Sequence, residues 1–181
     1  MSTPSPDSET VYSCARFTVH EVPVTLPSGE QVIKPIIRQN GAVVIVPELP
    51  DGRIVMIRNY RYSLGKTLLE LPAGTMEPNE DPLETAVREL QEETGYVAGS
   101  IKAVQPFYAA PGNCNEQMHL FIARDLTQGP PKRELGEQIE NEILDWETIA
   151  ELLQANQIED AKTLIGVMMY DRFYRQQKSP R

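Results

Sequence analysis

Clusters of lysine and arginine are absent from this chain of 181 residues, in which 17 basic and 26 acidic side chains give a formal net charge of −9. Proteins that bind nucleic acids neutralise phosphates with clustered Lys and Arg side chains. The charge balance therefore argues against a nucleic-acid partner. It favours small anions that reach the protein as metal complexes.

Cysteine is also scarce, because Cys14 and Cys114 are the only two thiols in the sequence. Two cysteines so far apart indicate neither a disulfide scaffold nor a zinc site. No apolar run reaches the roughly 18 residues that a membrane-spanning helix needs. The opening segment MSTPSPDSET is polar and does not contain the apolar core of a signal peptide. We therefore expect a cytoplasmic protein without a membrane partner.

The most informative segment is residues 74–96, GTMEPNEDPLETAVRELQEETGY, which we call the acidic box. It combines four glutamates and one arginine at fixed spacings. Five residues separate Gly74 from Glu80, and seven residues separate Glu80 from the run RELQEETGY that begins at Arg88. Carboxylates at such regular intervals indicate a site built for cations rather than an incidental run of charge.

The residues of the box also predict where a helix begins and ends. Asp81 is suited to cap a helix, Pro82 to its first turn and Gly95 to its end, so we expect a helix from Pro82 to Thr94. At about 100° per residue, one face of this helix is apolar and another is acidic. The predicted core-facing stripe is Leu83, Ala86, Val87 and Leu90, and the acidic face is Glu89, Glu92 and Glu93.

The three carboxylates of the acidic face repel one another, because like charges one helical turn apart are unfavourable. Arg88 can relieve Glu92, but one guanidinium cannot neutralise three carboxylates. Oxygen ligands without a nearby histidine or cysteine favour Mg²⁺ or Mn²⁺. The alternative is an acidic face that only meets solvent. The preceding turn LPAG disfavours that alternative, because it would bring a backbone carbonyl, that of Ala73, over the carboxylates.

The acidic box resembles the signature of the Nudix hydrolases, with every fixed position filled. The resemblance implies an α+β fold, in which an α/β/α sandwich surrounds a mixed β-sheet. It also implies metal ligation by the helix and by a backbone carbonyl. The implied metal ligands are the carbonyl of Ala73 and the carboxylates of Glu89, Glu92 and Glu93. The implied structural residues are Gly74, Glu80, Arg88, which would orient Glu92, and Gly95.

Three regions are expected along the chain. Residues 1–10 are rich in Ser, Thr and Pro and are expected to be disordered. Residues 11–40 alternate β-forming residues with turns, which predicts a small N-terminal antiparallel β extension. Residues 41–181 are expected to form the catalytic domain. Within it the sequence predicts strands near 42–46, 53–57, 101–108, 119–123 and 139–146, and helices near 147–154 and 161–177.

The N-terminal extension is too small to build a hydrophobic core of its own and would expose strand edges. We therefore expect a homodimer in which two chains exchange or pair these strands. The resemblance carries the same implication.

Segments outside the acidic box are similar to the ADP-ribose pyrophosphatase branch of the family. They are RNYR at residues 58–61, LLELPAG at 68–74 and PGNCNE at 111–116. The branch usually carries Gln where Asn59 stands. The implied substrate-binding residues are Arg58, Arg61, Pro111, Gly112 and Glu116. Arg61 is expected on the diphosphate, because the fork of a guanidinium matches phosphate oxygens.

A glutamate in a later loop is implied to activate the attacking water or to bind a further metal ion. Glu137 occupies that place, and Glu134 is its rival three residues earlier. Glu93 of the acidic box is the remaining catalytic candidate. Together these residues predict metal-dependent hydrolysis of ADP-ribose to AMP and ribose 5-phosphate. The alternatives are another nucleoside-diphosphate sugar, such as GDP-mannose or UDP-glucose, and a catalytically silent nucleotide sensor.

Overall fold

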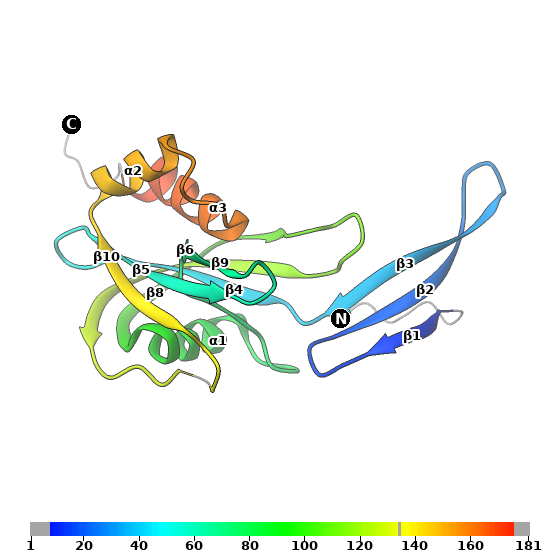
Figure 1. The fold of residues 1–181 in the computed structure, drawn as a ribbon, viewed down its shortest axis with the longest axis horizontal. Helices are drawn as coiled ribbons and strands as arrows, with labels where there is room; N and C mark the ends of the chain where they lie inside the picture. Colours follow the sequence, from blue (N-terminus) through cyan, green and yellow to red (C-terminus); the bar gives the residue numbers. More distant parts are fainter. Residues whose placement is uncertain (1–7, 134, 176–181) are drawn as a thin grey trace.

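The computed structural model describes residues 8–133 and 135–175. At the N-terminus, three antiparallel strands form a separate sheet in the order β1-β2-β3. Its strands are β1 (Glu9–Ser13), β2 (Phe17–Thr25) and β3 (Gln31–Gln39). This N-terminal sheet extends away from the rest of the molecule as a long arm (Figure 1). Strand β1 begins before the predicted boundary at residue 10, because Glu9 pairs with Glu21 and Thr10 with His20.

The body of the molecule contains two further sheets. A four-stranded mixed sheet has the order β7-β4-β9-β8, and a three-stranded antiparallel sheet has the order β10-β5-β6. The first sheet comprises β4 (Ala42–Pro47), β7 (Ala73–Thr75), β8 (Tyr96–Tyr108) and β9 (Gln117–Gln128). The second comprises β5 (Ile54–Arg61), β6 (Lys66–Glu70) and β10 (Ile139–Leu144). Strands β8 and β9 are longer than predicted, since they pair from Tyr96 opposite Gln128 to Tyr108 opposite Gln117.

Helices cover the body on two sides (Figure 1). They are α1 (Pro82–Glu89) with the π-helix η1 (Leu90–Thr94), α2 (Trp146–Gln154), and α3 (Ala161–Tyr170) with the π-helix η2 (Asp171–Arg175). Helix α1 lies on one side, and α2 with α3 lies on the other. The predicted α/β/α arrangement around a mixed sheet is therefore confirmed. None of the helices in the described part of the chain is long and apolar enough to cross a membrane.

Strand β4 sits between the two hydrophobic layers, because its side chains alternate between them. Val44 and Val46 pack with residues of α2 and α3, whereas Val43 and Ile45 pack with Ala86 and Leu90 of the acidic box. All six residues of β4 are buried. Strand β4, which pairs with β7, is therefore packed against other residues on both of its faces.

The predicted apolar stripe of α1 is wrong in part. Ala86 and Leu90 are fully buried, but Leu83 and Val87 are 45% and 47% exposed. The helix is turned so that Glu89 and other polar residues face inward instead. The reason is that α1 packs on β7 as well as on β4, and β7 approaches the side of the helix that carries the carboxylates. The acidic face is part of the interior rather than a surface opposite the core.

Candidate active site

The acidic box folds locally as its residues indicate. The Asp81 carboxylate accepts a hydrogen bond of 2.8 Å from the backbone N–H of Leu83, which caps α1 as expected. Gly95 ends the helix with φ at +81°, a conformation that suits glycine. A Cβ atom on Gly95 would also lie 2.3 Å from the carbonyl oxygen of Gly129. The helix therefore has the predicted start and end, although its last turn is a π-helix.

Two of the predicted metal ligands are buried beneath strand β7. Glu93 is 3% exposed, and its carboxylate accepts a hydrogen bond of 2.8 Å from the backbone N–H of Ala73. Burial raises the pKa of Glu93 to about 8, and the negative charges of Glu89 and Glu137 add to the effect of burial. Burial likewise raises the pKa of Glu89 to about 7, against the opposing charge of Arg88. The two carboxylates are thus largely removed from water, and the charge of Glu89 acts on that of Glu93.

Arg88 joins several acidic groups of the box. Its guanidinium donates two hydrogen bonds of 3.0 Å to Glu80, one of 2.7 Å to Glu89 and one of 3.0 Å to Glu92. The contact with Glu92 is the expected one, and the other two are additional. Hydrogen bonding from Arg88 lowers the pKa of Glu80 to about 2. Glu80 also accepts a hydrogen bond from the backbone N–H of Glu77, so it ties the loop before α1 to the helix.

The donor chemistry of the box fits a hard divalent cation. The candidate ligands are carboxylate oxygens, and burial raises the pKa values of Glu89 and Glu93, so a bound cation would stabilise the charged forms of these carboxylates. Within residues 8–133 and 135–175, no three His, Cys, Asp or Glu side chains form a ready-made metal cluster. Arg88 lies between Glu89 and Glu92 and binds both. Arg88 contacts only Oε1 of Glu89 and Oε2 of Glu92, so a metal ion could bind through the second oxygen of each carboxylate.

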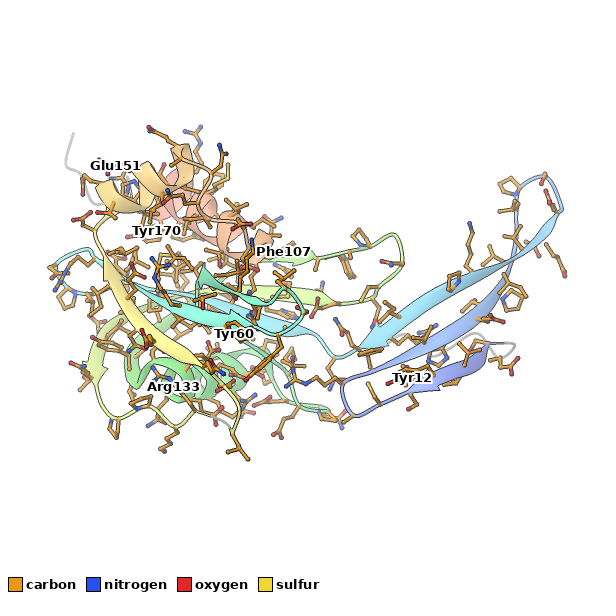
Figure 2. All side chains as sticks on the ribbon, in the orientation of Figure 1. Tyr12, Tyr60, Phe107, Arg133, Glu151 and Tyr170 are labelled. Atoms are coloured by element: carbon orange, nitrogen blue, oxygen red, sulfur yellow. The ribbon has the colours of Figure 1, made fainter. Side chains whose placement is uncertain are left out.

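A cavity of about 1080 Å³ opens over the buried carboxylates. Glu89, Glu93 and Glu137 line it together with Arg61 and Lys162. Aromatic side chains also contribute to its lining, namely Tyr60, Tyr62, Phe107 and Tyr108. Figure 2 shows Tyr60 and Phe107 near the middle of the body of the molecule in this view. Residues from both body sheets, α1 and α3 thus surround one space.

The predicted phosphate-binding residue Arg61 is held by a buried carboxylate. Its Nε and Nη2 atoms donate hydrogen bonds of 2.7 and 2.5 Å to the two oxygens of Glu70, which is 0% exposed. Lys162 of α3 binds the same carboxylate, and it also pairs with Asp160 at 2.9 Å. Sequence reasoning missed Glu70, Asp160 and Lys162. One signal was available, because Glu70 is a lone charge in the apolar run LLELP, and such a buried charge needs a partner.

The other predicted substrate residues are divided between the cavity and the surface. Glu116 lines the cavity, and burial raises its pKa against the opposing charge of Lys162. Pro111 and Gly112 of the same loop do not line the cavity. Arg58 points elsewhere, where it binds Glu142 on β10. The structure therefore groups Arg61 with Glu116 but leaves Arg58, Pro111 and Gly112 outside the cavity of this chain.

Of the two candidate glutamates in the later loop, the structure describes only Glu137. Glu137 lines the cavity, and its charge contributes to the raised pKa values of both Glu89 and Glu93. Its carboxylate is thus close enough to the box to interact with it. Glu134, the rival candidate, lies outside the described residues.

Comparisons with known proteins match most of this chain. The model of the NUDIX domain matches residues 38–166. An ADP-ribose pyrophosphatase of Bacillus subtilis is 34% identical over 161 residues, which cover 88% of this chain and 87% of that protein. A methanol dehydrogenase activator of Bacillus methanolicus is 37% identical, over 80% of this chain and 79% of that protein. A GDP-mannose pyrophosphatase of Yersinia enterocolitica is 30% identical, over 76% of each chain.

A solved structure of an ADP compounds hydrolase has the same fold, with a TM-score of 0.85 and 24% identity over 98% of this chain and 97% of that one. The matched domain spans the acidic box, Arg61 and Lys162, which the fold brings to one cavity. The chain therefore belongs to the Nudix hydrolase family.

Proposed function

We propose that this protein hydrolyses the diphosphate bond of ADP-ribose to AMP and ribose 5-phosphate, and that Mg²⁺ or Mn²⁺ is required. One observation carries the proposal. A single cavity combines the carboxylates Glu89, Glu93 and Glu137 with the cations Arg61 and Lys162. Carboxylates suit a metal ion, and the two cations suit the diphosphate that the ion accompanies. The names of relatives supply the nucleotide, since ADP-ribose pyrophosphatases are among them.

In this proposal, different residues bind the metal ion and accept the proton. Glu89, Glu92, Glu93 and the carbonyl of Ala73 would hold the ion, which when bound neutralises diphosphate oxygens and lowers the pKa of water. Glu137 accepts a proton from the attacking water. The water oxygen then forms a bond to one phosphorus while the bond from that phosphorus to the bridging oxygen breaks, so AMP and ribose 5-phosphate leave.

The size and lining of the cavity support a nucleotide substrate. Its volume of about 1080 Å³ is at the upper end of ordinary small-molecule sites, which suits a substrate with a base, two phosphates and two sugars. Tyr60 and Phe107 offer aromatic faces on which a base can stack. Glu116 offers a carboxylate to the hydroxyl groups of the terminal ribose.

A second candidate substrate is another nucleoside-diphosphate sugar. A GDP-mannose pyrophosphatase is among the relatives, and none of the described cavity residues distinguishes guanine from adenine by a fixed pattern of hydrogen bonds. UDP-glucose belongs to the same class. A silent sensor is not favoured, because every carboxylate of the acidic box is retained.

The test is a substrate panel with purified protein and Mg²⁺ or Mn²⁺, in which nucleotide products are separated by chromatography. We expect AMP from ADP-ribose with a higher kcat/KM than that of GMP from GDP-mannose or UMP from UDP-glucose. We also expect chelation with EDTA to abolish turnover and added Mg²⁺ to restore it. A higher kcat/KM for GDP-mannose or UDP-glucose would reassign the substrate. Tight binding of ADP-ribose without turnover would support the sensor.

We further propose that the protein acts as a cytoplasmic homodimer that is joined through the N-terminal sheet. The sheet exposes Val11, Tyr12 and Ile33, each at least half exposed, and β1 and β3 are its edge strands. The turn between β1 and β2 brings Ala15 and Arg16 to the rim of the cavity. Assembly through this sheet would therefore affect the site as well.

A further inference from the structure

The hydroxyl group of Tyr62 contacts both neighbours of Glu137. It donates a hydrogen bond of 3.4 Å to the backbone carbonyl of Gly136 and accepts one of 2.9 Å from the side-chain amide of Gln138. Tyr62 follows β5 directly, whereas Glu137 precedes β10. One side chain thus spans the gap between the β5–β6 turn and the segment that carries the loop glutamate.

The backbone next to Glu137 is also fixed, by a hydrogen bond on one side and by a glycine turn on the other. The N–H of Tyr60 donates a hydrogen bond of 3.0 Å to the carbonyl of Gln138, and the pairing of β10 with β5 begins at the next residue, Ile139 opposite Asn59. Gly136 has φ at +97°, which turns the chain immediately before Glu137. The contact of Tyr62 with Gly136 therefore lies on the far side of this turn from the strand.

Packing alone does not account for the placement of Tyr62. Its side chain is 67% exposed, so it contributes little to a hydrophobic core. Its ring meets that of Tyr60 edge to face, with centroids 5.1 Å apart and planes at 87°. This contact with Tyr60 fixes the direction of the ring and so aims the hydroxyl at the segment around Glu137.

We propose that Tyr62 is a positioning residue for the hydrolytic reaction. By binding Gly136 and Gln138, its hydroxyl holds the carboxylate of Glu137 in the cavity beside Glu89. The proposal rests on the proposed function, in which Glu137 accepts the proton from water. In this role the hydroxyl of Tyr62 acts through the segment around Glu137 and not on the reacting atoms.

A positioning role has a kinetic signature of its own. Removal of the Tyr62 hydroxyl leaves Glu137 and the substrate-binding groups in the protein, but the carboxylate samples more positions. A general base that is misplaced for part of the time slows the chemical step, whereas substrate binding is preserved. Loss of one hydrogen bond of this kind corresponds to roughly a 3- to 10-fold effect. We expect Tyr62→Phe to lower kcat by that factor while KM stays within about twofold.

The experiment compares Tyr62→Phe, Gln138→Leu and the double variant, all in the full chain, with the best substrate of the panel. We expect both single variants to lower kcat and the double variant to be no worse than the poorer single one, because both changes break the same contact. Tyr174→Phe is the matched control, since it removes the hydroxyl of a partly exposed tyrosine of η2 that does not line the cavity. Its kcat should equal that of the wild type.

Hydrogen–deuterium exchange supplies a readout that does not depend on turnover. In Tyr62→Phe, the peptide that contains residues 135–138 should exchange faster, while α1 and β4 stay protected. Unchanged exchange and unchanged kcat would overturn the proposal, as would a lower melting temperature with kcat and KM altered together. Wild-type kcat in Glu137→Gln would overturn the proton-transfer role and the Tyr62 proposal together. A substrate other than ADP-ribose in the panel would overturn only the substrate assignment.

Discussion

Gly74 lies directly against the carboxylate of Glu89. A Cβ atom added to Gly74 would be 1.9 Å from the carboxyl carbon of Glu89 and 2.0 Å from its Oε1 atom. The backbone of Gly74 does not have the positive φ that usually requires glycine. The first residue of the acidic box is therefore constrained by space, since only a hydrogen atom fits between β7 and the carboxylate.

We predict that Gly74→Ala will impair both stability and turnover. Either β7 or Glu89 must move by more than an ångström to accept the methyl group, and such overpacking costs about 1–3 kcal/mol. Urea unfolding and steady-state kinetics measure the two effects. Gly112→Ala is the control for unfolding, because a Cβ atom there meets no heavy atom within 4 Å. A Gly74→Ala variant as stable as Gly112→Ala would contradict the prediction.

Two isosteric substitutions should separate metal binding from proton transfer. In Glu93→Gln the amide oxygen can still accept the hydrogen bond from Ala73, so the fold is kept while one negative charge is lost. We expect weaker binding of Mg²⁺ or Mn²⁺ by calorimetry and little turnover even at high metal concentration. Glu137→Gln should bind substrate within a few-fold of the wild type, whereas its kcat falls roughly 10²–10⁴-fold. If Glu134→Gln shows that loss instead, the base is Glu134.

The buried carboxylate of Glu70 should matter strongly for stability. Glu70→Gln leaves Arg61 and Lys162 side by side with one negative charge fewer. Removal of one partner from a buried ion pair costs about 3–5 kcal/mol, and the lower end applies because Arg61 is 38% exposed. Addition of Lys162→Met should recover part of the loss in urea unfolding. Additive losses in the double variant would show that the three groups do not act together.

The contribution of Asp160 to the free energy of unfolding should depend on pH. Burial would raise the pKa of Asp160, but the charge of Lys162 and hydrogen bonds from Thr163 lower it below its usual value. Because the pKa of Asp160 is lower in the native state than in the unfolded state, the ionised carboxylate stabilises the native state at neutral pH. This stabilisation is lost as the pH falls through the native pKa. We expect Asp160→Ala to lose about 1 kcal/mol of unfolding free energy at pH 7. The difference from wild type should shrink below about pH 4, and an equal difference at pH 3 and pH 7 would refute it.

The assembly proposal predicts a change of mass on truncation. The full chain should scatter light as a particle of twice 20.4 kDa, whereas a chain that begins at Gln39 should be monomeric and less active. The truncated chain loses all three strands of the N-terminal sheet but keeps both sheets of the body. A monomeric full chain with undiminished activity would rule out the dimer.

Local spacing was enough to predict much of the acidic box. The Asp81 cap, the Gly95 end and the contact of Arg88 with Glu92 depend only on helical geometry over a few residues. The same geometry failed for Leu83, which is exposed. Which face of a helix is buried depends on what packs against it, and strand β7 approached the acidic side.

Contacts between distant segments could not be predicted from the sequence. Glu70 and Lys162 are 92 residues apart, and no local pattern links a strand to the first turn of the last long helix. The hydrogen bonds of Tyr62 to the segment around Glu137 are equally remote. The substrate residues Arg58, Pro111 and Gly112 are still predictions, because their positions follow from resemblance and not from contacts in this chain.

The parallel pairing of β4 with β9 limits how early the chain can fold during translation. Ala42 lies opposite Met118, so the central sheet cannot close until the ribosome has released the chain as far as β9. The acidic box emerges earlier, when neither β9 nor α3 is available to complete its surroundings. Catalytic geometry is therefore acquired late, after most of the chain has been translated, and a nascent chain that stalls before β9 carries the signature of the family without a working site.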